Sequence, residues 1–94
     1  TADGSTTTAV DVTSAVTEIN ATSATHSCAM ADGSDGQIKI VINTSTSGTN
    51  AITITPTNFS NTNFILNAKG ETAVCIFKSS KWYVIGGNGV TVTA

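Results

Sequence analysis

Apolar and polar residues alternate along most of this chain, with a period of two residues rather than the 3.6 of a helix. Successive side chains of a β-strand point to opposite faces, so such alternation predicts strands with one buried face. Threonine and valine, whose branched side chains fit a pleated sheet, are frequent in these segments. The alternating apolar positions are Val10, Val12 and Val16; His26, Cys28 and Met30; Ile38, Ile40 and Ile42; Ile52 and Ile54; and Phe64 and Leu66.

Two segments near the C-terminus are apolar on both faces. In TAVCIFK, Val74 and Ile76 share one face, whereas Cys75 and Phe77 share the other, and WYVI behaves in the same way. Continuous apolar character of this kind indicates a strand that is covered on both sides. We expect the core to consist of the inner stripes of consecutive strands, namely Ile38, Ile40, Ile54, Val74, Ile76, Trp82 and Val84.

Short segments rich in Gly, Asn, Ser and Asp separate the predicted strands. Asn88-Gly89 is a strong two-residue hairpin signal, because both residue types tolerate positive φ, and it would fold residues 90–93 back beside residues 82–85. Pro56 is expected to end its strand or to lie on a sheet edge. The pattern predicts an all-β fold, a small antiparallel β-sandwich or β-roll of about seven to eight short strands joined as meandering hairpins.

Length and composition indicate one small domain that needs partners. The chain has 94 residues, and we expect a flexible N-terminal arm of residues 1–8 followed by a single β domain of residues 9–94. Domains of this size bury a small share of their surface, so their stability commonly depends on disulfides, a metal or oligomerisation. Aromatic residues make up only 5% of the chain, and this thin apolar inventory favours oligomerisation.

Charge excludes some classes of function. Charged residues make up 11% of the chain, against roughly 25% in typical soluble domains. The net charge is −2 and the chain has no arginine, so it lacks the basic stripe of a nucleic-acid-binding protein.

No apolar run reaches the ~18 residues of a membrane span. TADGSTTT has neither the basic start nor the apolar block of a signal peptide, so either a leader is removed or the protein is made in a host cytoplasm.

The motifs that most resemble reactive or metal-binding sites fit simpler interpretations. Asp32 and Asp35 in DGSDG lack the series of oxygen ligands of a calcium loop, and they suit a turn. The segment GGNG, residues 86–89, lacks both the aspartate of a calcium repeat and the helix of a phosphate-binding loop. His26 has only Cys28 as a nearby soft ligand, which is too few for zinc. We therefore expect no catalytic residue, no metal and no cofactor.

The two cysteines leave two interpretations open. Cys28 and Cys75 form one disulfide if their strands are neighbours and the environment is oxidising, whereas two buried free thiols are expected in a cytoplasm. A nucleophile pair of Cys75 with His26 is formally possible, but a thiol in a strand that is apolar on both faces is typically an inert core residue.

Trp82 and Tyr83 are adjacent, so they point to opposite faces of one strand. We expect Trp82 to anchor the core, and Tyr83, together with Ile85 and Phe77, to lie at a contact with another subunit. The alternative is a platform on which sugars stack. KWYVI is too continuously apolar for such a platform, which favours the subunit contact.

The order of several motifs over residues 25–92 resembles a β-domain of bacteriophage virion proteins. The run ADGSDGQIKIVI is followed by ITPTNF, by FILNAKGETAVCIF and by KWYVIGGNGVTV. Glu71 departs from this pattern, since an aspartate is commoner there. The matching positions are Gly36-Gln37, Thr55-Pro56-Thr57-Asn58, Gly70-Glu71, Trp82-Tyr83, Gly86, Asn88 and Gly89.

The resemblance implies a structural virion component without catalytic residues, such as a head decoration (cement) protein, a head fibre or a tail fibre. It also implies a homotrimer that contacts the major capsid protein or another virion protein, on the capsid surface or in a fibre. The alternatives are a receptor- or glycan-binding module at a fibre tip and a subunit of an extracellular filament, in which the N-terminal arm adds a strand to a neighbour.

Overall fold

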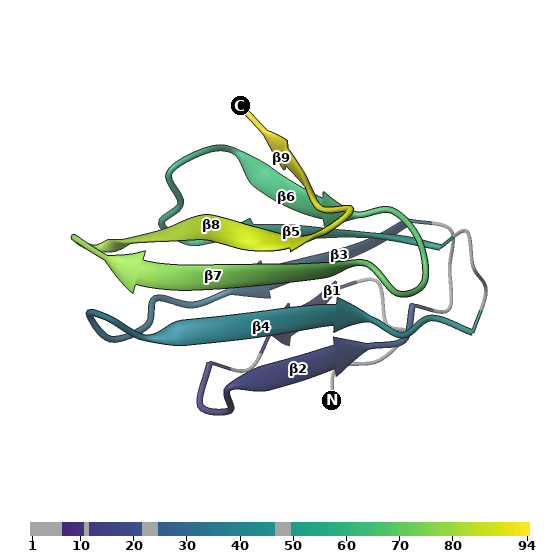
Figure 1. Cartoon of the computed structure of the whole chain (residues 1–94), viewed down its shortest axis with the longest axis horizontal. Coiled ribbons are helices and arrows are strands. Elements are labelled where there is room, and N and C mark those ends of the chain that lie inside the picture. Colours follow the sequence, from purple (N-terminus) through teal and green to yellow (C-terminus); the bar gives the residue numbers. More distant parts are fainter. Residues whose placement is uncertain (1–6, 11, 22–24, 47–49) are drawn as a thin grey trace.

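Two β-sheets that pack face to face make up the protein (Figure 1). A computed structural model describes residues 7–10, 12–21, 25–46 and 50–94 of the chain. These residues contain no helix, so the predicted all-β class is confirmed. The strands are β1 (Thr7–Val10), β2 (Val16–Ile19), β3 (Thr25–Met30), β4 (Ile38–Asn43), β5 (Ala51–Pro56), β6 (Asn63–Leu66), β7 (Thr72–Lys78), β8 (Lys81–Asn88) and β9 (Thr91–Thr93).

The five-stranded sheet has the order β1-β3-β5-β6-β9, and the four-stranded sheet has the order β2-β4-β7-β8. From β1 to β5 the chain alternates between the two sheets, and the neighbouring pairs β1–β3, β3–β5 and β2–β4 are parallel. The later neighbours are antiparallel. The predicted meander is therefore wrong for the first half of the chain. Each early connection crosses to the opposite sheet, so β1, β3 and β5 lie in one layer and β2 and β4 lie in the other.

Strand β1 begins inside the segment that was predicted to be a flexible arm, and β5 ends at the one proline. Thr7 and Thr8, which were expected in the arm, belong to β1, and residues 1–6 lie outside the described part of the chain. Pro56 is the last residue of β5, as predicted. Its ring nitrogen cannot donate a ladder hydrogen bond, which suits a strand end.

The hairpin predicted at Asn88-Gly89 is wrong. Strand β9 pairs with β6 in the five-stranded sheet, so the chain crosses between the sheets after β8. A type I′ turn needs positive φ at both central residues, and here Gly89 has a φ of 77° whereas Asn88 is not in that region. The turn with positive φ at both positions lies instead between β7 and β8, where Ser79 and Ser80 have φ angles of 53° and 66°.

The core lies between the two sheets. Trp82 and Ile54 are fully buried, and Val84 is partly buried against the core, in agreement with the predicted core. The buried apolar residues are Val10, Ile19, Ala21, Cys28, Met30, Val41, Ile52, Ile54, Phe64, Leu66, Ala73, Cys75, Phe77 and Trp82.

The predicted core residues are wrong for β4 and β7, the two central strands of the four-stranded sheet. Ile38, Ile40, Val74 and Ile76 were expected in the core, but they lie on the outer face of this sheet. Phe77 was expected at a subunit contact, but it is buried in the core. Both strands were thus assigned the wrong inner face.

Packing explains why β7 turns Phe77 inward. Phe77 is paired with Trp82 of β8, and their rings meet edge to face with centroids 5.2 Å apart and an interplanar angle of 70°. Aromatic pairs in this geometry are stabilised beyond the area they bury. The indole Nε1 of Trp82 also donates to the carbonyl oxygen of Ala31 at 2.9 Å, so the buried ring leaves no polar atom unsatisfied.

Hydrogen bonds explain how β4 can turn a lysine inward. Lys39 is fully buried, and its ammonium donates to the carbonyl oxygen of Ser14 at 2.7 Å and to the hydroxyl of Thr17. Both acceptors belong to the segment that enters and forms β2. Burying a cation is costly unless it is hydrogen-bonded, and these bonds offset that cost.

Asn43 fixes the other end of β4. Its side-chain amide donates to the carbonyl oxygens of Asn50 at 3.0 Å and Leu66 at 3.1 Å, and its Oδ1 accepts from the backbone N–H of Ser45 at 3.0 Å. These contacts hold Asn43 inside, so the alternate residues of β4 point outward.

Candidate functional site

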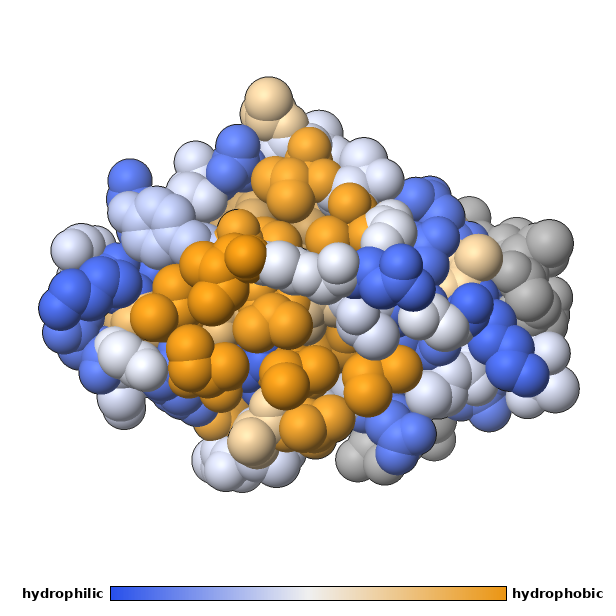
Figure 2. All heavy atoms as spheres, viewed as in Figure 1, coloured by the Kyte–Doolittle hydropathy of each residue, from blue (hydrophilic) through white to orange (hydrophobic). Residues whose placement is uncertain are grey.

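The outer face of the four-stranded sheet is the candidate functional site. We call its central part the aliphatic face, and its members are Val16, Glu18, Ile38, Ile40, Ile42, Thr72, Val74, Ile76, Tyr83 and Ile85. The paired lysines Lys78 and Lys81 lie on the same outer side of the sheet, beyond this central part, at the β7–β8 hairpin. Figure 2 shows this side of the molecule, with hydrophobic atoms gathered over β4, β7 and β8. Its exposed large apolar members are Ile85 at 58%, Val16 at 46%, Ile38 at 42% and Tyr83 at 37%.

Strand pairing places these side chains in rows that cross the sheet. One row runs from Tyr83 through Ile76 to Ile38. In the next row, Val74 lies opposite Ile40, which pairs in turn with Val16. Side chains directly opposite each other on neighbouring strands are in contact distance, so each row is continuous.

The third row of the aliphatic face is polar at both ends. It runs from Thr72 through Ile42 to Glu18. Glu18 is the one charged member of the face, and it lies on β2, at the edge of the sheet. The middle of the face is therefore uncharged.

A β-bulge produces the most exposed apolar member of the aliphatic face. The pairing of β7 with β8 shifts between Val74 and Cys75, where Val74 pairs with Gly86 and Cys75 pairs with Val84. Ile85 is the extra residue between these pairs. Bulges redirect side chains in this way, and Ile85 projects from the sheet with more than half of its surface exposed.

Gly87 holds the chain close to β7 just after the bulge. Its φ is 144°, and a Cβ atom at this position would lie 2.2 Å from the carbonyl oxygen of Thr72 and 3.0 Å from Cα of Ala73. Only glycine fits this approach. Gly87 therefore fixes the path of β8 beside the aliphatic face.

The outer face of the five-stranded sheet differs sharply from the aliphatic face. Among its described side chains, Ile65 is the one large aliphatic residue, and it is partly buried. The described members of this face are Ser27, Ala29, Ala51, Thr53, Thr55, Asn63, Ile65, Thr91 and Thr93. This is the small, polar surface expected where a sheet faces water. The aliphatic face lacks that character.

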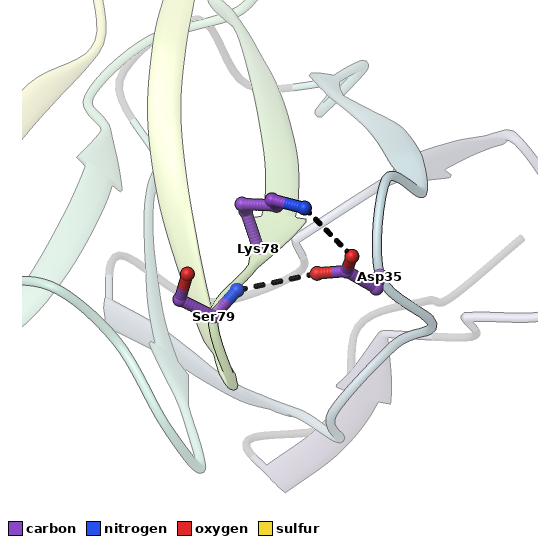
Figure 3. Close-up of polar contacts among 3 residues, drawn as sticks. All are labelled: Asp35, Lys78 and Ser79. Atoms are coloured by element: carbon purple, nitrogen blue, oxygen red, sulfur yellow. Dashed lines mark hydrogen bonds and ion pairs between the residues drawn. The ribbon is translucent and has the colours of Figure 1, made fainter.

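The predicted turn at DGSDG lies at one end of the sandwich, where both carboxylates make contacts within the protein. Asp35 accepts from the ammonium of Lys78 at 2.8 Å and from the backbone N–H of Ser79 at 3.2 Å (Figure 3). Asp32 accepts twice from the side-chain amide of Asn58, at 2.8 and 3.0 Å. The turn ties the segment before β4 to the β7–β8 hairpin.

The electrostatics of this turn follow from the same contacts. The hydrogen bond from Lys78 and that from the Ser79 N–H lower the pKa of Asp35 below its ordinary value. The hydrogen bond to Asp35 raises the pKa of Lys78. Both side chains are exposed, so this ion pair is a weak surface contact rather than a reactive site.

The other residues considered as chemical groups lie inside the sandwich. His26 and Cys28 are buried on the inner side of β3, and Cys75 is buried on the inner side of β7. The two cysteines do not form a disulfide with each other. Burial raises the pKa of Cys75 to about 12, which disfavours the reactive thiolate. The described part of the chain contains no group of three possible metal ligands and no pocket.

The two adjacent aromatic residues have different environments. Trp82 is fully buried, so its ring is not available as a sugar platform, whereas Tyr83 is exposed on the aliphatic face. Ile85 is exposed on the same face, but Phe77 is not. Sequence reasoning missed Ile38, Ile40, Val74, Ile76 and Val16 as members of this face. The strand QIKIVIN gave no signal of this, because its apolar side is opposed by Lys39 and Asn43, a pattern that predicts a buried isoleucine face.

No protein-family model and no curated protein matches the chain. The described residues include no helix that could cross a membrane.

Proposed function

We propose that the protein is a non-catalytic structural component of a virus particle, a capsid decoration protein or a fibre subunit, which associates with other chains through the aliphatic face. The observation that carries the proposal is the exposure of Ile38, Tyr83 and Ile85, with Val16, on one sheet face. The resemblance of residues 25–92 to phage virion β-domains supports the location on a particle. Its partners are copies of itself and another virion protein.

The exposed apolar area supports an association surface, because burying it against a partner would contribute free energy of association. Fully burying an aliphatic side chain contributes about 1.5–3 kcal/mol, so a side chain that is half exposed retains about 1 kcal/mol for a partner to recover. Ile85, Val16 and Ile38 each keep about half of their surface in water. A set of neighbouring apolar side chains of this kind is typical of a surface that meets another protein.

The proposed function is tested by locating the protein on particles. Particles purified from a culture that expresses the chain are imaged by cryo-electron microscopy, and their protein content is measured by mass spectrometry. We expect the chain in many copies per particle, at fixed positions on the capsid or on a fibre. Its presence in the lysate but not in purified particles would contradict the proposal.

A further inference from the structure

Asn88-Gly89 is a reactive motif to which the proposed function assigns no role. It is the one Asn-Gly pair among the eight asparagines of the chain. It does not form the hairpin that its sequence favours, because β9 pairs with β6. The side-chain amide of an asparagine reacts most readily with the next peptide nitrogen when glycine follows, since glycine has no Cβ to hinder the approach.

The fold leaves the side-chain amide of Asn88 unrestrained. Asn88 and Gly89 are both exposed. The backbone N–H of Asn88 donates to the hydroxyl of Thr72 at 3.1 Å, but its side-chain amide makes no hydrogen bond within the described part of the chain. By contrast, Asn43 is buried and bonded through both side-chain polar atoms, and the amide of Asn58 donates to a carboxylate. Asn88 thus combines exposure, an unbonded amide and a following glycine.

The backbone at Asn88 is held by few contacts. The register of β8 with β7 ends at Gly87, and beyond it an isolated bridge joins Gly89 to Thr72. For the side chain to close a ring onto the next nitrogen, Asn88 has to rotate out of the extended conformation of a strand. Strand ends open at a small free-energy cost compared with the core, so the folded protein reaches this conformation.

We propose that Asn88 is a site of spontaneous deamidation. The backbone nitrogen of Gly89 attacks Cγ of Asn88 and forms the C–N bond of a succinimide ring, while the side-chain nitrogen leaves as ammonia and takes up the proton of the Gly89 N–H. Water then opens the ring at either carbonyl, which gives aspartate or isoaspartate. The net reaction consumes one water and releases one ammonia, so it needs no enzyme, oxidant or cofactor, and it adds a negative charge.

The product loosens β9. A Cβ atom at Gly89 would lie 2.8 Å from Cγ and Cδ of Glu71, so this connection already runs against a carboxylate side chain. The new carboxylate places a second negative charge near it, and like charges repel. Isoaspartate also adds one carbon to the main chain just before β9. Because β9 is an exposed edge strand of three residues, we expect it to separate from β6.

Tryptic peptides isolate the site in the full chain. Cleavage after Lys81 gives residues 82–94, in which Asn88 is the one asparagine, whereas residues 1–39 and 40–69 contain the other seven. Native protein and guanidinium-unfolded protein are incubated at mildly alkaline pH, and mass spectrometry follows the conversion of amide to acid in each peptide. Asn88→Gln is the matched control, because it keeps the amide but would have to close a less favourable six-membered ring.

We expect residues 82–94 of the native chain to convert at a rate within about tenfold of that in the unfolded chain. Residues 1–39 and 40–69 of the native chain, and the Asn88→Gln variant at this position, should convert much more slowly. A native rate more than about tenfold below the unfolded rate overturns the site. So does equal conversion of all three peptides.

Hydrogen exchange tests the effect on β9. After the same incubation, the backbone amides of β6 and β9 should exchange at least about tenfold faster in the converted chain than in the Asn88→Gln variant. Equal exchange in the two proteins overturns the link between the modification and β9.

Discussion

Replacing Gly87 by alanine should unfold the protein at a much lower urea concentration, whereas replacing its neighbour Gly86 should not. At Gly87 the added Cβ would lie 2.2 Å from the carbonyl oxygen of Thr72, and the φ of 144° is unfavourable for any residue with a Cβ. At Gly86 the added Cβ meets nothing within 4 Å, and φ is not positive. The two variants therefore add the same methyl group to neighbouring positions of β8 in opposite environments.

The magnitude follows from these two environments. Residues held in a sparsely populated backbone region cost about 1–3 kcal/mol, and the clash with backbone atoms of β7 adds to this for Gly87→Ala. We expect a loss of about 3 kcal/mol or more, which corresponds to a fall in Tm of roughly 10 °C or more for a domain of this size. Gly86→Ala restricts the unfolded chain and should stabilise the protein by about 0.4–1 kcal/mol.

Urea unfolding followed by circular dichroism measures both variants. Because association adds to apparent stability, all proteins are compared at one low protein concentration. A Gly87→Ala variant within about 0.5 kcal/mol of the original chain would refute the close approach of β8 to β7. So would equal losses for the two variants.

Three further predictions concern the core and the β7–β8 hairpin. Trp82→Phe should cost about 2–4 kcal/mol in urea unfolding, because it removes volume and the hydrogen bond to Ala31, and a loss below about 1 kcal/mol would contradict this packing. Ser80→Gly should stabilise the protein by about 1 kcal/mol, because its φ of 66° is unfavourable for a residue with a Cβ, whereas Ser80→Ala should give no gain. Cys75 should resist a thiol reagent at pH 8 until urea unfolds the chain, and rapid labelling of the native protein would count against its burial. Burial raises the pKa of Cys75 from 9.0 to about 12. The protonated thiol therefore contributes fully to the free energy of unfolding below pH 9, and this contribution is lost as the pH rises toward 12.

The five-stranded sheet could be predicted from the sequence because each of its strands has one apolar side. Ile52 and Ile54 alternate with polar residues, so the buried face of β5 follows from the period alone. In β6, Phe64 and Leu66 are buried on the inner face as predicted, although Ile65 between them is also apolar. The parallel order of strands β1, β3 and β5 could not be predicted, because strand periodicity does not record to which sheet each strand belongs.

The aliphatic face could not be predicted, because the pattern of β4 favours burial of its isoleucine side and β7 carries apolar side chains on both sides. Period two identifies the two sides of such a strand but not which one faces the core. Contacts with neighbouring strands decide it, above all the bonds of Lys39 to Ser14 and Thr17 and the pairing of Phe77 with Trp82. A buried lysine contradicts the usual preference of that residue for the surface.

The exposed fraction of Ile85 in the assembled protein tests the central claim most directly. It is 58% in the single chain, and that of Ile38 is 42%. A high-resolution structure of the protein in its assembly measures both values. We predict that both side chains are buried there against an apolar surface of another chain. If Ile38 and Ile85 still face solvent in the assembly, the aliphatic face is not the association surface.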